Sequence, residues 1–195
     1  GKSNIISRLK TIGIEVDNED PKIKKILNEV KDREFIGYSY DGADASFELL
    51  ARRIIGEIPT YLTISEYDVS VKKNNKGKII SIAKAHILVD GNEVVCEGEG
   101  NGPVNALDNA IRKNVDKVGK YSKYLKDLKL VDYKVRILNT GTEAITRVSI
   151  ESTDSKGKNW FTIGVSTNII EASFKALIDS LDYKLFKEQA PASKL

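Results

Sequence analysis

The sequence has one cysteine, one histidine, no methionine and no long apolar run. A disulfide and a CxxC metal site each need two cysteines, so the lone Cys96 excludes both within this chain. A reducing cytoplasm is therefore the simplest location to expect. No stretch of about 18 apolar residues occurs, so we expect no contact with a membrane, and no signal peptide is visible.

Charge and titratable side chains point away from several function classes. Lysine and arginine number 31 against 28 acidic residues, a net charge of +3 without a basic block, so nucleic acid is not an expected partner. His86 cannot be placed beside a nucleophile from the sequence. The carboxylate pairs Asp41 with Asp44 and Glu97 with Glu99 are explained by a helix start and by strand spacing. We expect neither catalytic residues nor metal ligands in this chain.

The size of the chain allows an ordinary hydrophobic core. Its 195 residues, 41% of them hydrophobic, fit one large domain or a small domain with a compact partner. The chain begins at Gly1-Lys2 without methionine, so we expect it to be a piece of a longer protein.

Residues 1–60 have helical periodicity. Asp20 followed by Pro21 predicts a helix start, and Asp44 predicts a second one, ended by Gly56. Each helix has one apolar stripe, formed by Ile23, Ile26, Leu27 and Val30 in the first and by Phe47, Leu50, Ala51 and Ile54 in the second. Two short amphipathic helices cannot bury their faces alone, so we interpret residues 1–60 as a helical linker subdomain that packs on another part.

From about Tyr61 the apolar period changes from 3.6 to 2. Strands are predicted around 67–71, at 79–89 and at 93–97, with Asp90-Gly91 as a hairpin turn, and a helix begins at Pro103. This unit is strand, strand, strand, helix.

The same unit returns 66 residues later, since Gly164 matches Gly98 and 164 − 98 = 66. A gap-free shift of 66 also aligns Tyr67 with Tyr133, Val69 with Val135, Ile82 with Val148, Gly91 with Gly157, Ala106 with Ala172 and Ala110 with Ala176. We therefore predict an α+β fold in which residues 61–187 form two pseudo-symmetric βββα units. The lysine-rich segment 116–129 connects them, and residues 188–195 are expected to be a disordered tail.

The alternating glycines Gly98, Gly100 and Gly102 do not form a nucleotide-binding motif. A dinucleotide fingerprint needs glycine at the sixth position, where Pro103 stands, and a P-loop needs Lys-Ser/Thr where Pro103-Val104 stand. A phosphate site at this turn is therefore not expected.

The glycine segments do precede two helix starts. Gly102 before Pro103 and Asn168 before Ile169 occupy N-cap positions, and Glu171 would complete a capping box with Asn168. Free N–H groups and the partial positive charge at a helix start suit a carboxylate, and upstream glycines let a ligand approach the backbone. The alternative is that the glycines only let strand and helix pack tightly.

Three stretches resemble one known family. They are residues 37–50 (GYSYDGADASFELL), 98–107 (GEGNGPVNAL) and 164–173 (GVSTNIIEAS), and they resemble the C-terminal regulatory region of the α-isopropylmalate synthase family. The resemblance extends to about Phe186. With Trp160 ahead of the third stretch and Asp182-Tyr183-Lys184-Leu185 behind it, the chain looks more like the citramalate synthase branch than the leucine branch.

The resemblance implies a transferase of amino-acid biosynthesis that condenses acetyl-CoA with pyruvate, giving (R)-citramalate on a route to isoleucine. In that family the chemistry takes place on a TIM barrel with a divalent metal, which this chain lacks, so the chain alone is expected to be inactive and without a cofactor. Its C-terminal region is the allosteric part, which forms a homodimer and binds the end-product amino acid, while the helical linker contacts the barrel. Isoleucine is the expected feedback inhibitor, and leucine is the alternative.

Carried over to this sequence, the family's effector site falls on both glycine segments. The first unit would contribute Gly98, Gly100, Asn101, Pro103 and Val104, and the second Gly164, Ser166 and Asn168. Since Gly100 and Gly102 become Ser166 and Asn168, the two halves should not bind equivalently. A module that only joins two subunits, without sensing an amino acid, is the remaining alternative.

Overall fold

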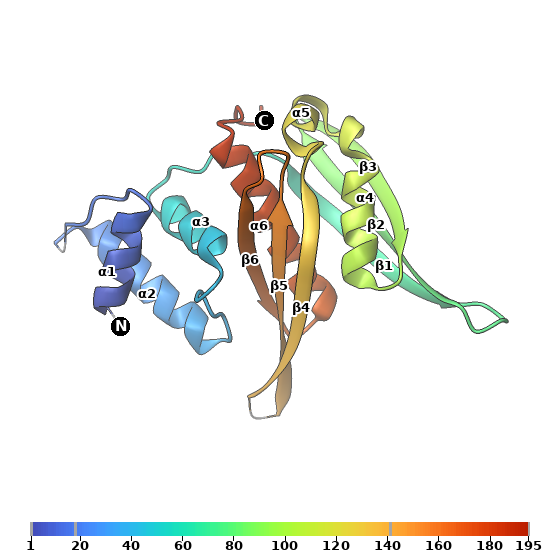
Figure 1. The fold of residues 1–195 in the computed structure, drawn as a ribbon, viewed down its shortest axis with the longest axis horizontal. Coiled ribbons are helices and arrows are strands. Elements are labelled where there is room, and N and C mark those ends of the chain that lie inside the picture. Colours follow the sequence, from blue (N-terminus) through green and yellow to red (C-terminus); the bar gives the residue numbers. More distant parts are fainter. Residues whose placement is uncertain (1, 18, 141, 195) are drawn as a thin grey trace.

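The computed structural model describes residues 2–17, 19–140 and 142–194 (Figure 1). Three helices come first and are followed by two units of three strands and a helix, which confirms the predicted α+β fold. The elements are α1 (Lys2–Thr11), α2 (Pro21–Phe35), α3 (Asp44–Ile54), β1 (Thr63–Lys73), β2 (Ile79–Val89), β3 (Asn92–Gly100), α4 (Pro103–Arg112), η1 (Val115–Lys117), η2 (Gly119–Tyr121), α5 (Ser122–Leu125), β4 (Lys129–Thr140), β5 (Glu143–Thr153), β6 (Asn159–Ser166) and α6 (Ile169–Lys187).

Each unit is an antiparallel sheet with its own helix. The sheet orders are β1-β2-β3 and β4-β5-β6, so the middle strand of each unit is also the middle strand of its sheet. Helix α4 packs on β3 and β2, and α6 packs on β6 and β5. One continuous core contains buried residues from both sheets and both helices, for example Ile87, Leu107, Ile150 and Leu181. The two units therefore fold as one body.

The pairing of the middle strands, β2 and β5, shows that the predicted gap-free shift of 66 is wrong by one residue in these strands. Val69 lies opposite Ala83, and its counterpart Val135 lies opposite Val148. Ala83 and Val148 are both fully buried and are 65 residues apart (148 − 83 = 65), whereas Ile82 is only partly buried. Because successive side chains point to opposite faces of a sheet, an error of one residue exchanges the buried face for the outer one.

The helical segment forms a second core against the outer face of the second sheet. Leu9, Ile26 and Phe47 pack in one cluster with Ile163 and Val165 of β6. This cluster supplies the buried partner that short amphipathic helices require.

The helix starts in this segment agree only in part with the sequence. Asp20 caps α2 as predicted, since its carboxylate accepts a hydrogen bond from the Lys22 backbone N–H at 2.9 Å. The prediction for Asp44 is wrong, because Ala43 is the N-cap of α3. Asp44 lies in the first turn and pairs with the Arg8 guanidinium at 2.9 Å. A carboxylate in the first turn still interacts favourably with the helix dipole, although it does not cap the helix.

Polar contacts join α3 to the second unit. The Ser46 hydroxyl accepts a hydrogen bond from the Ile163 backbone N–H at 2.9 Å and donates one to Asp179 at 2.8 Å. Arg53 pairs with Asp179 and with Asp182, each at 2.9 Å. Helix α6 therefore holds the helical segment through the carboxylates of Asp179 and Asp182.

The expectation of a disordered tail at residues 188–195 is wrong for residues 188–194. Ala190 is buried, and the Tyr121 hydroxyl donates a hydrogen bond to the Pro191 carbonyl at 2.8 Å. The Ser193 backbone N–H donates to the Thr60 carbonyl at 2.8 Å. The expectation for Leu195 falls outside the described residues. Tertiary contacts with distant residues order this polar segment, and local composition does not reveal them.

Candidate functional site

Three of the glycines lie where a strand and its helix meet. A Cβ on Gly98 would be 2.6 Å from the Cα of Ala110 in α4, and one on Gly100 would be 2.5 Å from the backbone nitrogen of Ala106. In the second unit, a Cβ on Gly164 would be 2.8 Å from the backbone nitrogen of Ala176. These glycines let each helix lie directly on its sheet, so tight packing accounts for them.

Gly102 has different surroundings, because a Cβ placed there would meet no described atom within 4 Å. It is the N-cap of α4, and within the described residues no side chain caps that helix. Pro103 follows as the first helical residue, and Asn105 uses its side-chain oxygen to accept the Asn101 backbone N–H at 3.3 Å. The start of α4 therefore keeps backbone donors that no side chain satisfies.

The start of α6 is capped by its own side chains. The Asn168 side-chain oxygen accepts the backbone N–H groups of Ile170 at 2.8 Å and Glu171 at 3.2 Å. The predicted capping box is wrong in its second half, since the Asn168 N–H donates to the Ser166 hydroxyl at 3.1 Å. That hydroxyl in turn donates to the Glu171 carboxylate at 3.2 Å. The two helix starts therefore differ chemically, with the first one open and the second one closed.

The predicted effector residues are brought to one end of the molecule but differ in accessibility. Helices α4 and α6 both begin at the lower end of the view in Figure 1, where β3 and β6 finish. Val104 is buried at 3% exposure, whereas Asn101 and Asn168 are exposed. The best-defined cavities among the described residues lie elsewhere, one of them with about 660 Å³ between α1 and α2. The effector site stays a prediction, and Gly100, Asn101, Pro103, Ser166 and Asn168 are its reachable members.

Strands β1 and β4, the first strands of the two units, each expose a row of apolar side chains on the face of the sheet that carries the helix. We call these two rows the edge rows. The β1 row includes Tyr67 at 37% and Val71 at 61% exposure, and the β4 row includes Tyr133 at 42% and Ile137 at 69%. Their alternation predicts half-buried strands, and in the structure α4 packs mainly on β3 and β2 and α6 mainly on β6 and β5, which leaves β1 and β4 less covered. Apolar rows at equivalent places in both units are typical of a protein–protein contact.

Burial raises the pKa of two carboxyl groups on α6. Desolvation raises the pKa of Asp182 to about 7, and the Arg53 guanidinium only partly offsets this effect. The pKa of Asp179 is raised for the same reason. Burial also raises the pKa of the Cys96 thiol, whose side chain has no exposed surface. A buried, protonated thiol is a poor nucleophile, so Cys96 acts as a small core residue.

Within residues 2–17, 19–140 and 142–194, no group of three or more His, Cys, Asp and Glu side chains is arranged to hold a metal ion. Among the helices of the same ranges, none combines the length and the apolar character needed to cross a bilayer.

Comparisons with known proteins give one consistent result. A family model described as the LeuA allosteric (dimerisation) domain matches residues 41–185. The (R)-citramalate synthase of Aquifex aeolicus is 44% identical over 192 residues, which cover 97% of this chain and 36% of that protein. The enzyme of the same name from Geobacter sulfurreducens is 42% identical with the same coverage. A probable 2-isopropylmalate synthase of Methanopyrus kandleri is 27% identical over 179 residues. The chain thus spans about a third of the length of the curated relatives it matches.

Proposed function

The chain belongs to the LeuA allosteric (dimerisation) domain family, and from this premise we propose that it joins two subunits of an (R)-citramalate synthase and binds isoleucine as their feedback inhibitor. The whole enzyme would condense acetyl-CoA with pyruvate on a metal-dependent barrel outside this chain. The relatives named as citramalate synthases support this choice, because they are more similar than the probable 2-isopropylmalate synthase. Leucine is therefore the second candidate effector.

The observation that carries the dimer proposal is the pair of edge rows. A twofold dimer uses the same patch on both subunits, so that patch must complement itself. Tyrosine, valine and isoleucine side chains can do this without pairing charges, and burying them stabilises association by about 25 cal/mol for each Å² of apolar surface. We place the subunit contact on the β1 and β4 rows.

Sedimentation velocity tests this contact. The double variant with Val71→Ser and Ile137→Ser should convert a dimer to monomers, because it removes the two most exposed members of the rows. Phe161→Ser is the matched control, since Phe161 is 41% exposed and lies opposite Glu151, on the other face of β6 from the buried Trp160. A wild-type chain that is monomeric at tens of micromolar, or a double variant that remains dimeric, would contradict the placement.

The unequal helix starts suggest how an amino acid would bind. The open start of α4 can accept the effector carboxylate through backbone N–H groups, next to Gly102, where space is free. The closed start of α6 cannot offer the same groups, because Asn168 already uses them. We therefore assign the carboxylate to the first unit and side-chain contacts to the second.

Thermal unfolding tests the effector. A ligand that binds only the folded chain raises its stability by RT ln(1 + [L]/Kd), about 2.7 kcal/mol at a hundredfold excess over Kd. Isoleucine should therefore raise the melting temperature more than leucine or valine at equal concentration. If the chain is dimeric and its melting temperature is the same with and without all three amino acids, it is only a structural dimerisation module.

A further inference from the structure

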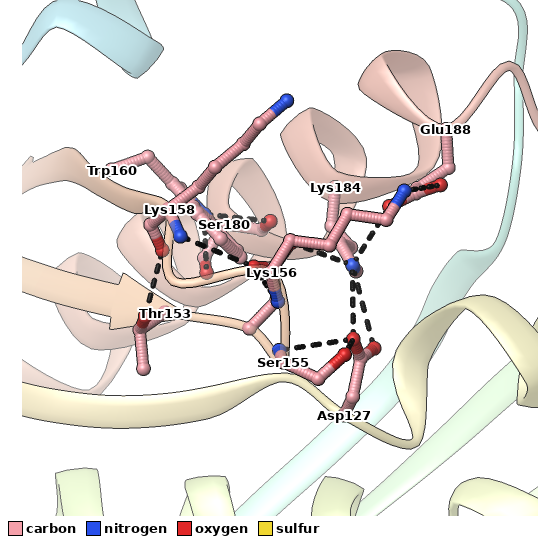
Figure 2. Close-up of polar contacts among 10 residues, drawn as sticks. Asp127, Thr153, Ser155, Lys156, Lys158, Trp160, Ser180, Lys184 and Glu188 are labelled. Carbon is pink, nitrogen blue, oxygen red and sulfur yellow. Dashed lines mark hydrogen bonds and ion pairs between the residues drawn. The ribbon is translucent and has the colours of Figure 1, made fainter.

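A second cavity lies at the opposite end of α6 from the predicted effector residues. It has a volume of about 270 Å³ and lies between the β5–β6 turn and the C-terminal half of α6 (Figure 2). Four lysines and two carboxylates line it, together with Trp160 and Tyr183. At a rise of 1.5 Å per residue, the helix places Tyr183 roughly 21 Å from Ile169. The cavity is therefore separate from the proposed isoleucine site.

One wall of the cavity is a fixed ionic cluster. Lys184 is 3% exposed, and its ammonium pairs with Asp154 at 2.8 Å, Glu188 at 3.0 Å and Asp127 at 3.4 Å. Hydrogen bonds from Lys184 help to hold the pKa of Asp154 and Glu188 below their ordinary values, so both carboxylates are charged at neutral pH. Lys184 offsets one of the three carboxylate charges and holds this wall in place.

Of the other three lysines, two are already paired with carboxylates, and only Lys158 leaves an unpaired positive charge at the rim. Lys156 pairs with Glu188 at 3.0 Å, and Lys187 pairs with Glu48 at 2.9 Å while lying over the Tyr183 ring. The ammonium of Lys158 makes no hydrogen bond or ion pair with the described residues, and Figure 2 shows it extending away from the cluster. An anion entering here would meet Lys158 first, because its charge is not already paired.

Aromatic rings supply the apolar part of the lining. Trp160 and Tyr183 have ring centroids 6.1 Å apart. The Trp160 indole N–H already donates to the Ser180 hydroxyl at 3.2 Å, so the ring contributes its apolar surface to a ligand and keeps its polar group in the protein. Ligand pockets usually start at about 300 Å³, which limits an occupant of this cavity to a small molecule.

We propose that this cavity binds a small organic anion with a flat ring, whose negative group contacts Lys158 and whose ring lies against Trp160 and Tyr183. The unpaired Lys158 ammonium favours the anion, and the aromatic surface favours the ring. The inference does not depend on isoleucine binding or on dimerisation.

Trp160 provides the readout, since it is the only tryptophan in the chain. Its fluorescence would be followed during titration with benzoate, with inorganic phosphate and with uncharged benzamide, at constant ionic strength and pH 7.5. Benzoate should change the emission and saturate in the millimolar range, while phosphate and benzamide should bind at least tenfold more weakly. No saturable change with benzoate up to 50 mM, or equal effects of all three probes, would overturn the proposal.

Two charge-reversal variants locate the site. Lys158→Glu should weaken benzoate binding at least tenfold. Lys78→Glu makes the same change of charge in the β1–β2 turn, outside the cavity lining, and should leave binding unchanged. Because Lys158 is exposed, Lys158→Glu should keep the wild-type melting temperature, which separates lost binding from lost folding. Equal benzoate affinity in both variants would refute the assigned site.

Discussion

Gly98→Ala tests whether the glycine segment serves packing or ligand access. The added Cβ would be 2.6 Å from the Ala110 Cα and closer still to the Ala110 backbone nitrogen, whereas ordinary contact begins at 3.4 Å, so α4 must move by at least roughly 0.8 Å (3.4 − 2.6 = 0.8). Backbone atoms of a helix cannot rotate away as a side chain can. A gap of 0.5–1 Å between two packed groups loses about a quarter to a half of their dispersion attraction. The movement of α4 would open such gaps around its six buried residues.

The expected cost is near the upper end of the range for overpacked cores, about 3 kcal/mol. For a chain of this length that corresponds to a melting temperature about 6–12 °C lower. Urea unfolding followed by circular dichroism measures the change in the free energy of unfolding.

Gly102→Ala is the matched control. Its Cβ meets no described atom within 4 Å, and a φ of −157° is accessible to any residue, so the cost should stay below about 1 kcal/mol, the loss of a weak N-cap. If Gly98→Ala leaves the free energy of unfolding unchanged but weakens isoleucine binding, the packing explanation is wrong and Gly98 serves ligand access.

Three further outcomes follow from the buried polar groups. Lys184→Ala should lower the free energy of unfolding by about 3–5 kcal/mol, because it removes the ammonium that pairs with the buried Asp154 carboxylate, while Lys158→Ala should change it little; similar urea midpoints would contradict the ionic cluster. Burial raises the pKa of Asp182 from 3.8 to about 7, so the folded chain holds a proton that the unfolded chain releases, and stability should fall as pH rises across that window. Asp182→Asn should reduce this slope by up to about 1.4 kcal/mol per pH unit, and an unchanged slope would refute the assignment. Cys96 should react with a thiol reagent only when urea unfolds the chain, and fast labelling of the folded chain would show that its strand is exposed.

The repeated unit could be predicted because local signals agree with the final packing. Strand alternation, the glycine turns and the Asp20 cap each depend on neighbouring residues, and each persists in the structure. The register of the middle strand could not be predicted in the same way. The connection before β2 spans residues 74–78, whereas β4 and β5 are separated by residues 141–142, so a gap-free alignment fails between them. Register depends on which face is buried, and that is a property of the whole sheet.

The candidate site, too, could be predicted only as far as neighbouring residues determine it. Sequence places Gly98 and Gly164 before helix starts, but it does not show that their missing side chains face Ala110 and Ala176. It predicts a capping box of Asn168 with Glu171, whereas the Ser166 hydroxyl accepts the Asn168 backbone N–H in place of Glu171. The cavity beside Trp160 brings together residues from a turn and from the end of α6, which no local pattern connects.

The most direct test of the regulatory function is calorimetric titration of the chain with isoleucine, leucine and valine. We predict saturable binding of isoleucine and an affinity for valine that is weaker by about 1–3 kcal/mol, the worth of one methylene in an apolar pocket. Tighter binding of leucine would assign the chain to the leucine branch. No heat from any of the three at millimolar concentration would contradict amino-acid sensing by this chain.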